Sequence, residues 1–347
     1  MARRLISTFA LTTLLILPVI AGFDSARATR HAPVPHALQT ITLGMGYVPS
    51  VQFAPFYLAD QRGYYRQAGL GVDFAYGGSP NQLELVGTGH VTFAIADGTD
   101  VLVAAAQGVP VTYVTTQYQR LPAAIFALSS RGIRSVADLR GKTVGLPFRF
   151  GALYAGLLAA LHTAGLRPDK DVMIKTVGFN QAVTVQGGKV DAAVDYSNNG
   201  PVILARRGLR ITVLQIGDVT DLVGPGVIAG RPLIARNPEL VRAFVQATLR
   251  GMADAVRDPQ SAFTIARQAK GLPPLRGSNV GDQYAVLQRT IPFWHDRATH
   301  AHGLGYADPA QWRDSARILQ EIGQLPHMPA IDDALVTNRF AAGSPKL

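Results

Sequence analysis

The sequence predicts an α/β protein with two similar lobes, and two observations support this prediction. Short runs rich in β-branched residues alternate with turns and amphipathic stretches, as strands and helices do in α/β folds. The alternation begins at residues 41–47 and starts again at 142–146, so a second α/β unit follows the first. With 347 residues, 48% of them hydrophobic, the chain is long enough to fill two domain cores.

Each lobe is expected to contain at least four strands. The predicted strands are 41–47, 72–76, 91–96 and 111–114 in the first lobe, and 142–146, 172–177, 192–196 and 209–214 in the second. A helix is expected at 152–164 in the second lobe. The last third of the chain changes to long amphipathic helices that we expect to pack on the first lobe: 238–257, 259–269, 280–290 and 309–322.

A diverged internal repeat supports the two-lobe prediction. Residues 89–95 align with 188–194 at an offset of 99, and residues 109–114 align with 209–214 at an offset of 100. Each copy is expected to form a strand, a polar turn, a short helix and another strand. The polar turns of the two copies therefore occupy equivalent places in the two lobes.

The two polar turns are the first candidates for a binding site. Ligands of open parallel sheets bind beyond the carboxyl ends of the strands, where loops and helix starts leave polar groups unpaired. Asp97 and Thr99 lie in the first turn, and Tyr196 and Asn198 hold the aligned positions in the second. Because such side chains are poor core residues, we expect both turns to line one ligand cleft.

The chain is expected to cross between the lobes twice, near 124–128 and near 223–229, which gives a two-segment hinge. The predicted domains are lobe I, made of 39–126 and 226–345, and lobe II, made of 127–225.

The first residues are typical of a cleavable signal peptide at 1–28. Arg3 and Arg4 precede an apolar stretch at 5–23, and the small-residue triplet 26–28 predicts cleavage after Ala28. The general secretory route and the twin-arginine route both stay open. The chain has no cysteine, which excludes a lipidated cysteine anchor, so a freely soluble periplasmic protein is expected.

Charge and motifs exclude several classes of function. The formal charge of +10 comes largely from arginines spread singly, without a basic stripe interleaved with aromatics, so no nucleic-acid partner is expected. Lys142 and Thr143 follow a glycine but lead into a strand, which does not fit a phosphate loop. His295, His300 and His302 are interpreted as surface histidines, and no metal, cofactor or catalytic residue is predicted.

Several segments resemble a known family. The segments are GYVPSVQFAPFYLA at 46–59, the stretches 63–72 and 87–110, and SVADLRGKTVG at 135–145. They resemble the thiamine-pyrimidine-synthase-like group of type II substrate-binding proteins. This resemblance implies the type II periplasmic-binding-protein fold. It also implies a monomer that is not an enzyme and that delivers a small molecule to the permease subunits of an ABC importer.

The resemblance implies a choice of ligands, since members of the group handle thiamine pyrimidines, riboflavin, alkylsulfonates, taurine or nitrate. Segments 52–55, 118–120 and 178–181 are most similar to the branches that bind riboflavin or the thiamine pyrimidine. Riboflavin is favoured, because Gly200 stands where pyrimidine-binding relatives often carry an acidic residue. The alternatives are a binding protein for sulfonate, taurine or nitrate anions, and a thiamine-pyrimidine synthase. The synthases use a cysteine-rich iron motif and a pyridoxal-phosphate lysine, and this chain has no cysteine.

A planar heterocycle is bound by aromatic faces and a few directed hydrogen bonds. The predicted ligand-binding residues offer one or the other, or lie at helix starts and turns: Tyr47, Gln52, Phe53, Ser79, Asp97, Thr99, Tyr118, Phe148, Gly151, Phe179, Tyr196, Asn198 and Asn199. Asp97 is expected to be the only strand-end carboxylate of the site. Asp195 is expected to point away, because alternate residues of a strand face opposite sides.

Overall fold

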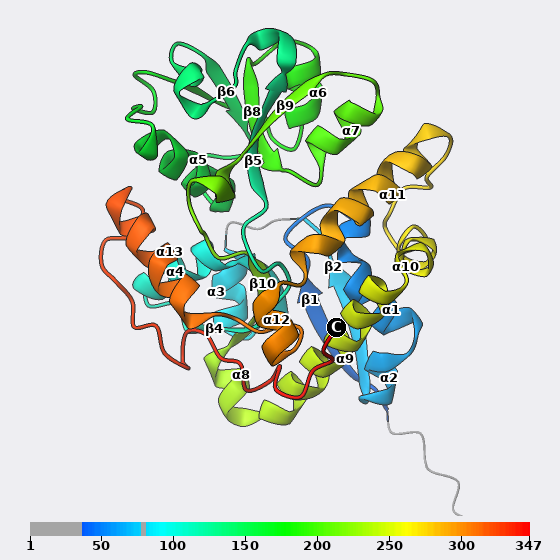
Figure 1. The fold of residues 1–347 in the computed structure, drawn as a ribbon. Coiled ribbons are helices and arrows are strands. Elements are labelled where there is room, and N and C mark those ends of the chain that lie inside the picture. The colour runs from blue at the N-terminus through cyan, green and yellow to red at the C-terminus, as the bar shows by residue number, and fades with distance from the viewer. Residues whose placement is uncertain (1–36, 78–80) are drawn as a thin grey trace, which may run out of the picture. The chain divides into compact units, whose positions relative to one another are not determined.

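Two five-stranded sheets organise the computed structural model, which describes residues 37–77 and 81–347 (Figure 1). The described part from Ala37 to Leu347 forms one unit. The predicted signal peptide and its cleavage site lie outside the described residues. Among the helices that the structure describes, none has the length and apolarity needed to cross a membrane.

The strand orders are β2-β1-β3-β10-β4 in the first sheet and β7-β6-β8-β5-β9 in the second. The first sheet contains β1 (Gln39–Gly44), β2 (Leu70–Ala75), β3 (Phe93–Asp97), β4 (Val111–Thr116) and β10 (Pro225–Gly230). The second contains β5 (Ala123–Leu128), β6 (Thr143–Leu146), β7 (Met173–Thr176), β8 (Ala192–Tyr196) and β9 (Ile211–Gln215).

The two sheets share one topology, which confirms the internal repeat. In the first, β1 pairs in parallel with β2 and β3, and β10 runs antiparallel between β3 and β4. In the second, β6 pairs in parallel with β7 and β8, and β5 runs antiparallel between β8 and β9. Along the chain, β5 of the second sheet follows β4 of the first, and β10 of the first sheet follows β9 of the second. The chain therefore passes between the sheets twice.

The eight predicted strands are present, but the two segments expected to connect the lobes are strands as well. β5 and β10 read AAIFAL and PGVIAG, and nearly all their residues are buried. Ala, Gly and Pro make up half or more of each segment, and these residues are depleted in strands, which explains why the sequence pattern did not reveal them. The connections between the sheets are therefore 117–122 and 216–224.

Helices cover both faces of each sheet. Besides the four helices predicted in the last third of the chain, the described helices are α1 (Ala54–Gln61), α2 (Tyr64–Gln67), α3 (Gln82–Gly87), α4 (Gly98–Ala106), α5 (Ala152–Thr163), α6 (Gln181–Gln186), α7 (Gly200–Arg206), α8 (Arg231–Arg236) and α12 (Arg297–His302). In the second sheet, Ile125 packs with α5 and its neighbour Phe126 packs with α6 and α7 on the opposite face. Figure 1 shows α5 to one side of this sheet and α6 and α7 to the other.

The predicted long helices are α9 (Pro238–Arg257), α10 (Pro259–Ala266), α11 (Ser278–Thr290) and α13 (Pro309–Glu321). Three of them begin at a proline that follows an Asn or Asp, and Asn237 accepts a hydrogen bond from the amide of Leu240 as an N-cap does. α9 packs on α1 so closely that a methyl group at Gly251 would overlap the carbonyl oxygen of Pro55. The four helices thus pack on the first sheet, as expected.

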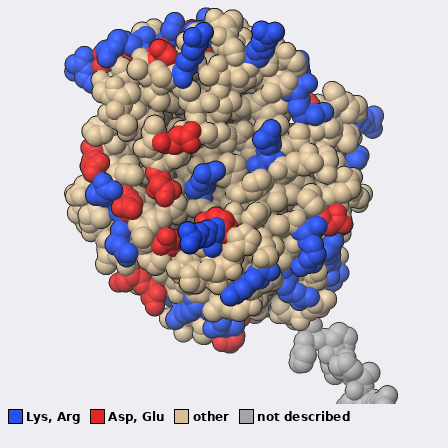
Figure 2. Space-filling model, viewed as in Figure 1, with Lys and Arg blue, Asp and Glu red and all other residues tan. Residues whose placement is uncertain are grey.

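Lysine, arginine and acidic side chains are interspersed on the face drawn in Figure 2, with large uncharged areas between them. No basic stripe crosses this face, which agrees with the scattered arginines of the sequence.

Candidate functional site

A cavity of about 480 Å³ is lined by loops that follow the carboxyl ends of strands in both sheets. Tyr47 comes after β1, Asp97 ends β3, Phe148 comes after β6, and Tyr196 ends β8. This is the position at which open parallel sheets bind ligands. The repeat thus supplies equivalent loops from both sheets to one cavity, as the sequence predicted.

Aromatic rings form much of the cavity lining: Tyr47, Phe53, Tyr118, Phe148, Phe150, Phe179 and Tyr196. Phe148 stacks on Phe150 at 5.0 Å between centroids and meets the edge of Phe179 at 5.5 Å. Phe179 in turn meets Tyr47 edge-on at 4.9 Å. The side chains of Phe148, Phe150 and Phe179 are 38%, 56% and 43% exposed, an apolar patch of the kind that marks a binding surface.

The two aligned strand ends meet at the cavity. The hydroxyl of Tyr196 donates a hydrogen bond to Oδ1 of Asp97 at 2.6 Å, and these residues hold the same place in the two copies of the repeat. Burial raises the pKa of Asp97 to about 6, and the hydrogen bond from Tyr196 limits the rise. Burial and the negative charge of Asp97 raise the pKa of Tyr196 well above its usual value. The bond therefore links a carboxyl of β3 to a neutral tyrosine of β8.

Two glutamines repeat the same symmetry, and sequence reasoning missed them. Nε2 of Gln82 donates to the carbonyl oxygen of Ile95 at 3.1 Å, and Nε2 of Gln181 donates to that of Val194 at 3.5 Å. Both side chains line the cavity. Gln82 is the first residue of α3 and Gln181 is the first residue of α6. They fasten α3 and α6 to the strand ends of β3 and β8. Gln82 and Gln181 lie 99 residues apart, which is the offset of the repeat, and this match was the signal in the sequence that could have revealed them.

Three carboxyl groups line the cavity, from Asp97, Asp100 and Asp195, and no Lys, Arg or His does so among the residues that the structure describes. Burial and the charge of Asp97 raise the pKa of Asp100 well above its usual value. Burial raises the pKa of Asp195 to about 6, although N–H groups of Tyr196 and Gly200 donate to its carboxyl. The cavity is rich in acceptors and lacks a cationic side chain in its described lining.

The predictions for Asp195 and for Asp97 as the only strand-end carboxylate are wrong. The Asp195 carboxyl turns toward the start of α7, where it accepts the Gly200 N–H at 3.1 Å. A β-carbon at Gly200 would lie 2.5 Å from Oδ2 of Asp195. The carboxyl of Asp195 thus lies where a side chain at position 200 would begin. Asp195 is next to the last residue of β8, where the alternation of side chains between the two faces of the sheet no longer applies.

Most of the predicted ligand-binding residues line this cavity: Tyr47, Gln52, Phe53, Asp97, Tyr118, Phe148, Gly151, Phe179, Tyr196 and Asn199. Their part in binding stays a prediction. Thr99 and Asn198 are buried outside the lining. Nδ2 of Asn198 donates to Gln52 at 3.1 Å and to Thr290 at 2.6 Å, because its turn packs against α11 and the 3-10 turn at Val51–Phe53. Ser79 lies outside the described residues.

Gln117 is a further lining residue that the sequence did not reveal. Its side chain is 2% exposed, and its Nε2 donates to the carbonyl oxygen of Gln52 at 3.4 Å. Its Oε1 is buried and has no hydrogen-bond partner within the described part of the chain. A buried acceptor without a partner is costly unless a ligand or water satisfies it.

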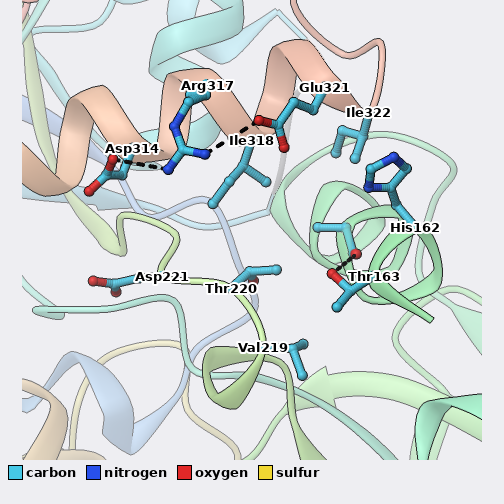
Figure 3. Close-up of a pocket in the computed structure, with 11 residues that line it drawn as sticks. His162, Thr163, Val219, Thr220, Asp221, Asp314, Arg317, Ile318, Glu321 and Ile322 are labelled. Carbon is cyan, nitrogen blue, oxygen red and sulfur yellow. Dashed lines mark hydrogen bonds and ion pairs between the residues drawn. The ribbon is translucent and has the colours of Figure 1, made fainter. Parts of the chain in front are cut away.

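A second cavity of about 310 Å³ lies between α5, the segment 219–221 and α13 (Figure 3). Arg317 on α13 is hydrogen-bonded to both Asp314 and Glu321, as the dashed lines in Figure 3 show. Apart from His162, no ring lines this cavity in the described chain. It therefore lacks the aromatic faces that a planar ligand requires.

The histidines near the C-terminal end do not gather into a site. The ring of His302 stacks on Tyr306 at 4.3 Å, and the rings of His295 and His300 lie 5.9 Å apart. Across residues 37–77 and 81–347, no group of three or more His, Asp or Glu side chains is placed to hold a metal ion.

Comparison with known proteins gives a family and a fold. Residues 50–262 match the family model described as NMT1/THI5 like. Riboflavin-binding protein RibY of Chloroflexus aurantiacus is 40% identical over 99% of both chains. The 4-amino-5-hydroxymethyl-2-methylpyrimidine phosphate synthase of Legionella pneumophila is 28% identical over 73% of this chain and 79% of its own.

Among solved structures, the alkanesulfonate-binding protein SsuA of Xanthomonas axonopodis pv. citri, bound to MOPS, superimposes with a TM-score of 0.66. It is 19% identical and covers 86% of this chain and 98% of its own. At this identity the likeness shows the fold alone, and it confirms the predicted type II periplasmic-binding-protein fold.

Proposed function

Because the chain belongs to the NMT1/THI5-like family, we propose that it captures riboflavin in the cavity at the strand ends and hands it to the permease of an ABC importer. The observation that carries the proposal is the lining itself, which combines seven aromatic rings and three carboxyl groups with no cationic side chain among its described members. Full-length similarity to riboflavin-binding protein RibY supports the same ligand.

The chemistry of riboflavin fits this lining. Its flat tricyclic ring offers two faces for aromatic contacts, and its imide N–H and ribityl hydroxyls can donate to carboxyl and amide oxygens. The molecule carries no charge near neutral pH, so it needs no cationic partner. The cavity volume of about 480 Å³ lies inside the range of about 300–1,000 Å³ that is usual for sites of small ligands.

An anion is a poor ligand for the same cavity. Sulfonate, taurine and nitrate would bring a negative group beside Asp97 and Asp195, whose pKa values of about 6 leave both carboxyls mostly ionised at neutral pH, and like charges repel. An anion site also needs N–H donors or cations, and the donor atoms of Gln82, Gln181 and Tyr196 are used inside the protein. The likeness to SsuA therefore extends to the fold and not to the ligand.

A thiamine pyrimidine is the second candidate. Its exocyclic amine could donate to Asp97 or Asp100, and Asp195 supplies a carboxyl beside position 200. A pyrimidine would occupy only part of the cavity, which favours the larger flavin.

The synthase alternative does not fit the residues present. The chain has no cysteine for an iron motif, and no lysine lines the cavity in the described residues to hold pyridoxal phosphate. We therefore propose a binding protein that releases its ligand unchanged.

The domain boundaries follow the sheets in this proposal. Lobe I is built on the first sheet and lobe II on the second, with β5 assigned to lobe II and β10 to lobe I. The connections at 117–122 and 216–224 form the hinge between them. A periplasmic location after removal of residues 1–28, a monomeric state and docking to permease subunits complete the proposal.

A thermal-shift panel tests the ligand. The protein is heated with riboflavin, a thiamine pyrimidine, taurine, an alkylsulfonate or nitrate. Riboflavin at about 100 times its Kd stabilises the folded chain by about 2.7 kcal/mol, which raises Tm by about 4 °C for a chain of this length. A saturable shift with taurine, sulfonate or nitrate, and none with riboflavin, contradicts the proposal.

A further inference from the structure

We propose that Asn198 is a positioning residue that holds the two lobes together over the ligand and so slows the release of the ligand, although Asn198 does not line the cavity. This inference rests on the proposed function and deepens it, because it names a residue of lobe II that acts on the ligand through Gln52 of lobe I. In a two-lobed binding protein the lobes separate when the ligand leaves, so contacts that exist only between joined lobes slow its release.

The side chain of Asn198 packs against the lobe to which it does not belong. Asn198 lies in the turn that follows β8 of the second sheet, and it is 1% exposed. Its Nδ2 donates to Oγ1 of Thr290, the last residue of α11, at 2.6 Å, and to Oε1 of Gln52 at 3.1 Å. Both acceptors belong to lobe I, so both hydrogen bonds are lost when the lobes separate.

Gln52 connects Asn198 with the cavity. Gln52 lines the cavity, and its Oε1 also accepts a hydrogen bond from the hydroxyl of Tyr118 at 3.4 Å. Tyr118 lines the cavity as well and lies in the connection 117–122 between the sheets. One oxygen atom of lobe I is therefore bonded to lobe II and to the proposed hinge, and all three side chains are buried. Asn198 thus fixes the side chain of Gln52 while the lobes are joined.

The other polar contacts between the residues 196–207 and lobe I are less suited to this role. Tyr196 and Asn199 line the cavity, so a bound ligand competes for their hydrogen bonds. Arg206 forms an ion pair with Asp282 on α11 at 3.0 Å, but 47% of the Arg206 side chain is exposed, and exposed ion pairs contribute little. Of these four described residues of lobe II, Asn198 alone is both fully buried and outside the cavity lining.

Stopped-flow fluorescence of the whole protein with riboflavin measures the association and dissociation rate constants. We expect Asn198→Ala to release riboflavin about 10-fold faster than the wild-type protein, because two hydrogen bonds between the lobes are lost. The association rate constant should not fall, because the ligand enters while the lobes are apart. Thr290→Val removes one acceptor from the opposite lobe, outside the cavity lining, and should speed release about 3-fold.

Thr248→Val is the matched control. Thr248 is also a buried threonine of lobe I, and its hydroxyl donates to the carbonyl oxygen four residues earlier at 2.9 Å, as that of Thr290 does at 2.8 Å. The other partner of Thr248 is the hydroxyl of Tyr65, which belongs to lobe I as well. Loss of the Thr248 hydroxyl should therefore lower the stability of the fold without changing the dissociation rate constant of riboflavin.

The outcomes separate the two proposals. An unchanged dissociation rate constant in Asn198→Ala and Thr290→Val, or an equal rise in Thr248→Val, overturns this inference and leaves riboflavin binding intact. Failure of the wild-type protein to bind riboflavin overturns the proposed function itself. If Asn198→Ala does not fold, as judged by its thermal unfolding, Asn198→Ser is measured in its place beside Thr290→Val, and faster release is again the expected result.

Discussion

The hydrogen bond from Tyr196 to Asp97 connects the two sheets, and a double-mutant cycle measures what it contributes. The donor and acceptor oxygens are 2.6 Å apart, and the acceptor is a partly buried carboxyl that lines the cavity. A hydrogen bond to a charged group contributes about 1.5–3 kcal/mol, compared with about 0.5–1.5 kcal/mol for a neutral pair. We therefore expect Tyr196→Phe and Asp97→Ala to show a coupling of about 1.5–3 kcal/mol in the free energy of unfolding at pH 8.

Chemical denaturation of the wild-type protein, both single variants and the double variant gives the coupling. Because the pKa of Asp97 is raised to about 6, the coupling should fall at pH 5, where the carboxyl is protonated. Tyr284→Phe is the matched control, since the hydroxyl of Tyr284 makes no hydrogen bond in the described structure, and it should combine additively with Asp97→Ala. A coupling below about 0.5 kcal/mol at pH 8 would refute the bond as a link between the sheets.

Three further predictions follow from the same structure. Asp195 has a pKa raised from 3.8 to about 6, so the folded state binds its proton more tightly than the unfolded chain; lowering the pH from 7 to 4 should stabilise the wild-type protein relative to Asp195→Asn. Between these two pH values the raised pKa of Asp195 should make this relative gain about 2 kcal/mol, measured by denaturation at each pH. Phe179→Ala should weaken riboflavin binding about 3- to 10-fold in a fluorescence titration, whereas Val183→Ala, outside the cavity lining, should not; equal effects of the two would contradict the aromatic wall. Gly251→Ala should lower the free energy of unfolding by about 1–3 kcal/mol, because its methyl group has no room beside Pro55, and an unchanged value would contradict the helix packing.

Much of the fold could be predicted because its signals are local. Strand runs, proline-led helix starts and the offset of 99 residues between aligned turns are all visible in the sequence, and the aligned pair Asp97 and Tyr196 meets in the cavity. β5 and β10 escaped prediction because Ala, Gly and Pro, which are depleted in strands, make up half or more of each. Their places in the sheets depend on pairing with strands far away in the chain.

Site residues could be predicted where they lie at the end of a strand. They could not be predicted where a contact with another part of the chain sets the direction of the side chain. Asp195 faces the cavity because the amide of Gly200 attracts its carboxyl, and strand alternation alone gave the opposite direction. Asn198 was expected at the ligand and instead binds Gln52 and Thr290, since its turn packs against other elements. Gln117 carried no signal, because only the tertiary structure leaves its oxygen without a partner.

The central claim is that one uncharged flavin binds in the cavity and leaves it unchanged. Isothermal titration of the protein with riboflavin, followed by mass analysis of the ligand released on unfolding, tests it most directly. The account predicts saturable binding of one riboflavin per chain and recovery of intact riboflavin. Absence of binding, or recovery of an altered product, would contradict it.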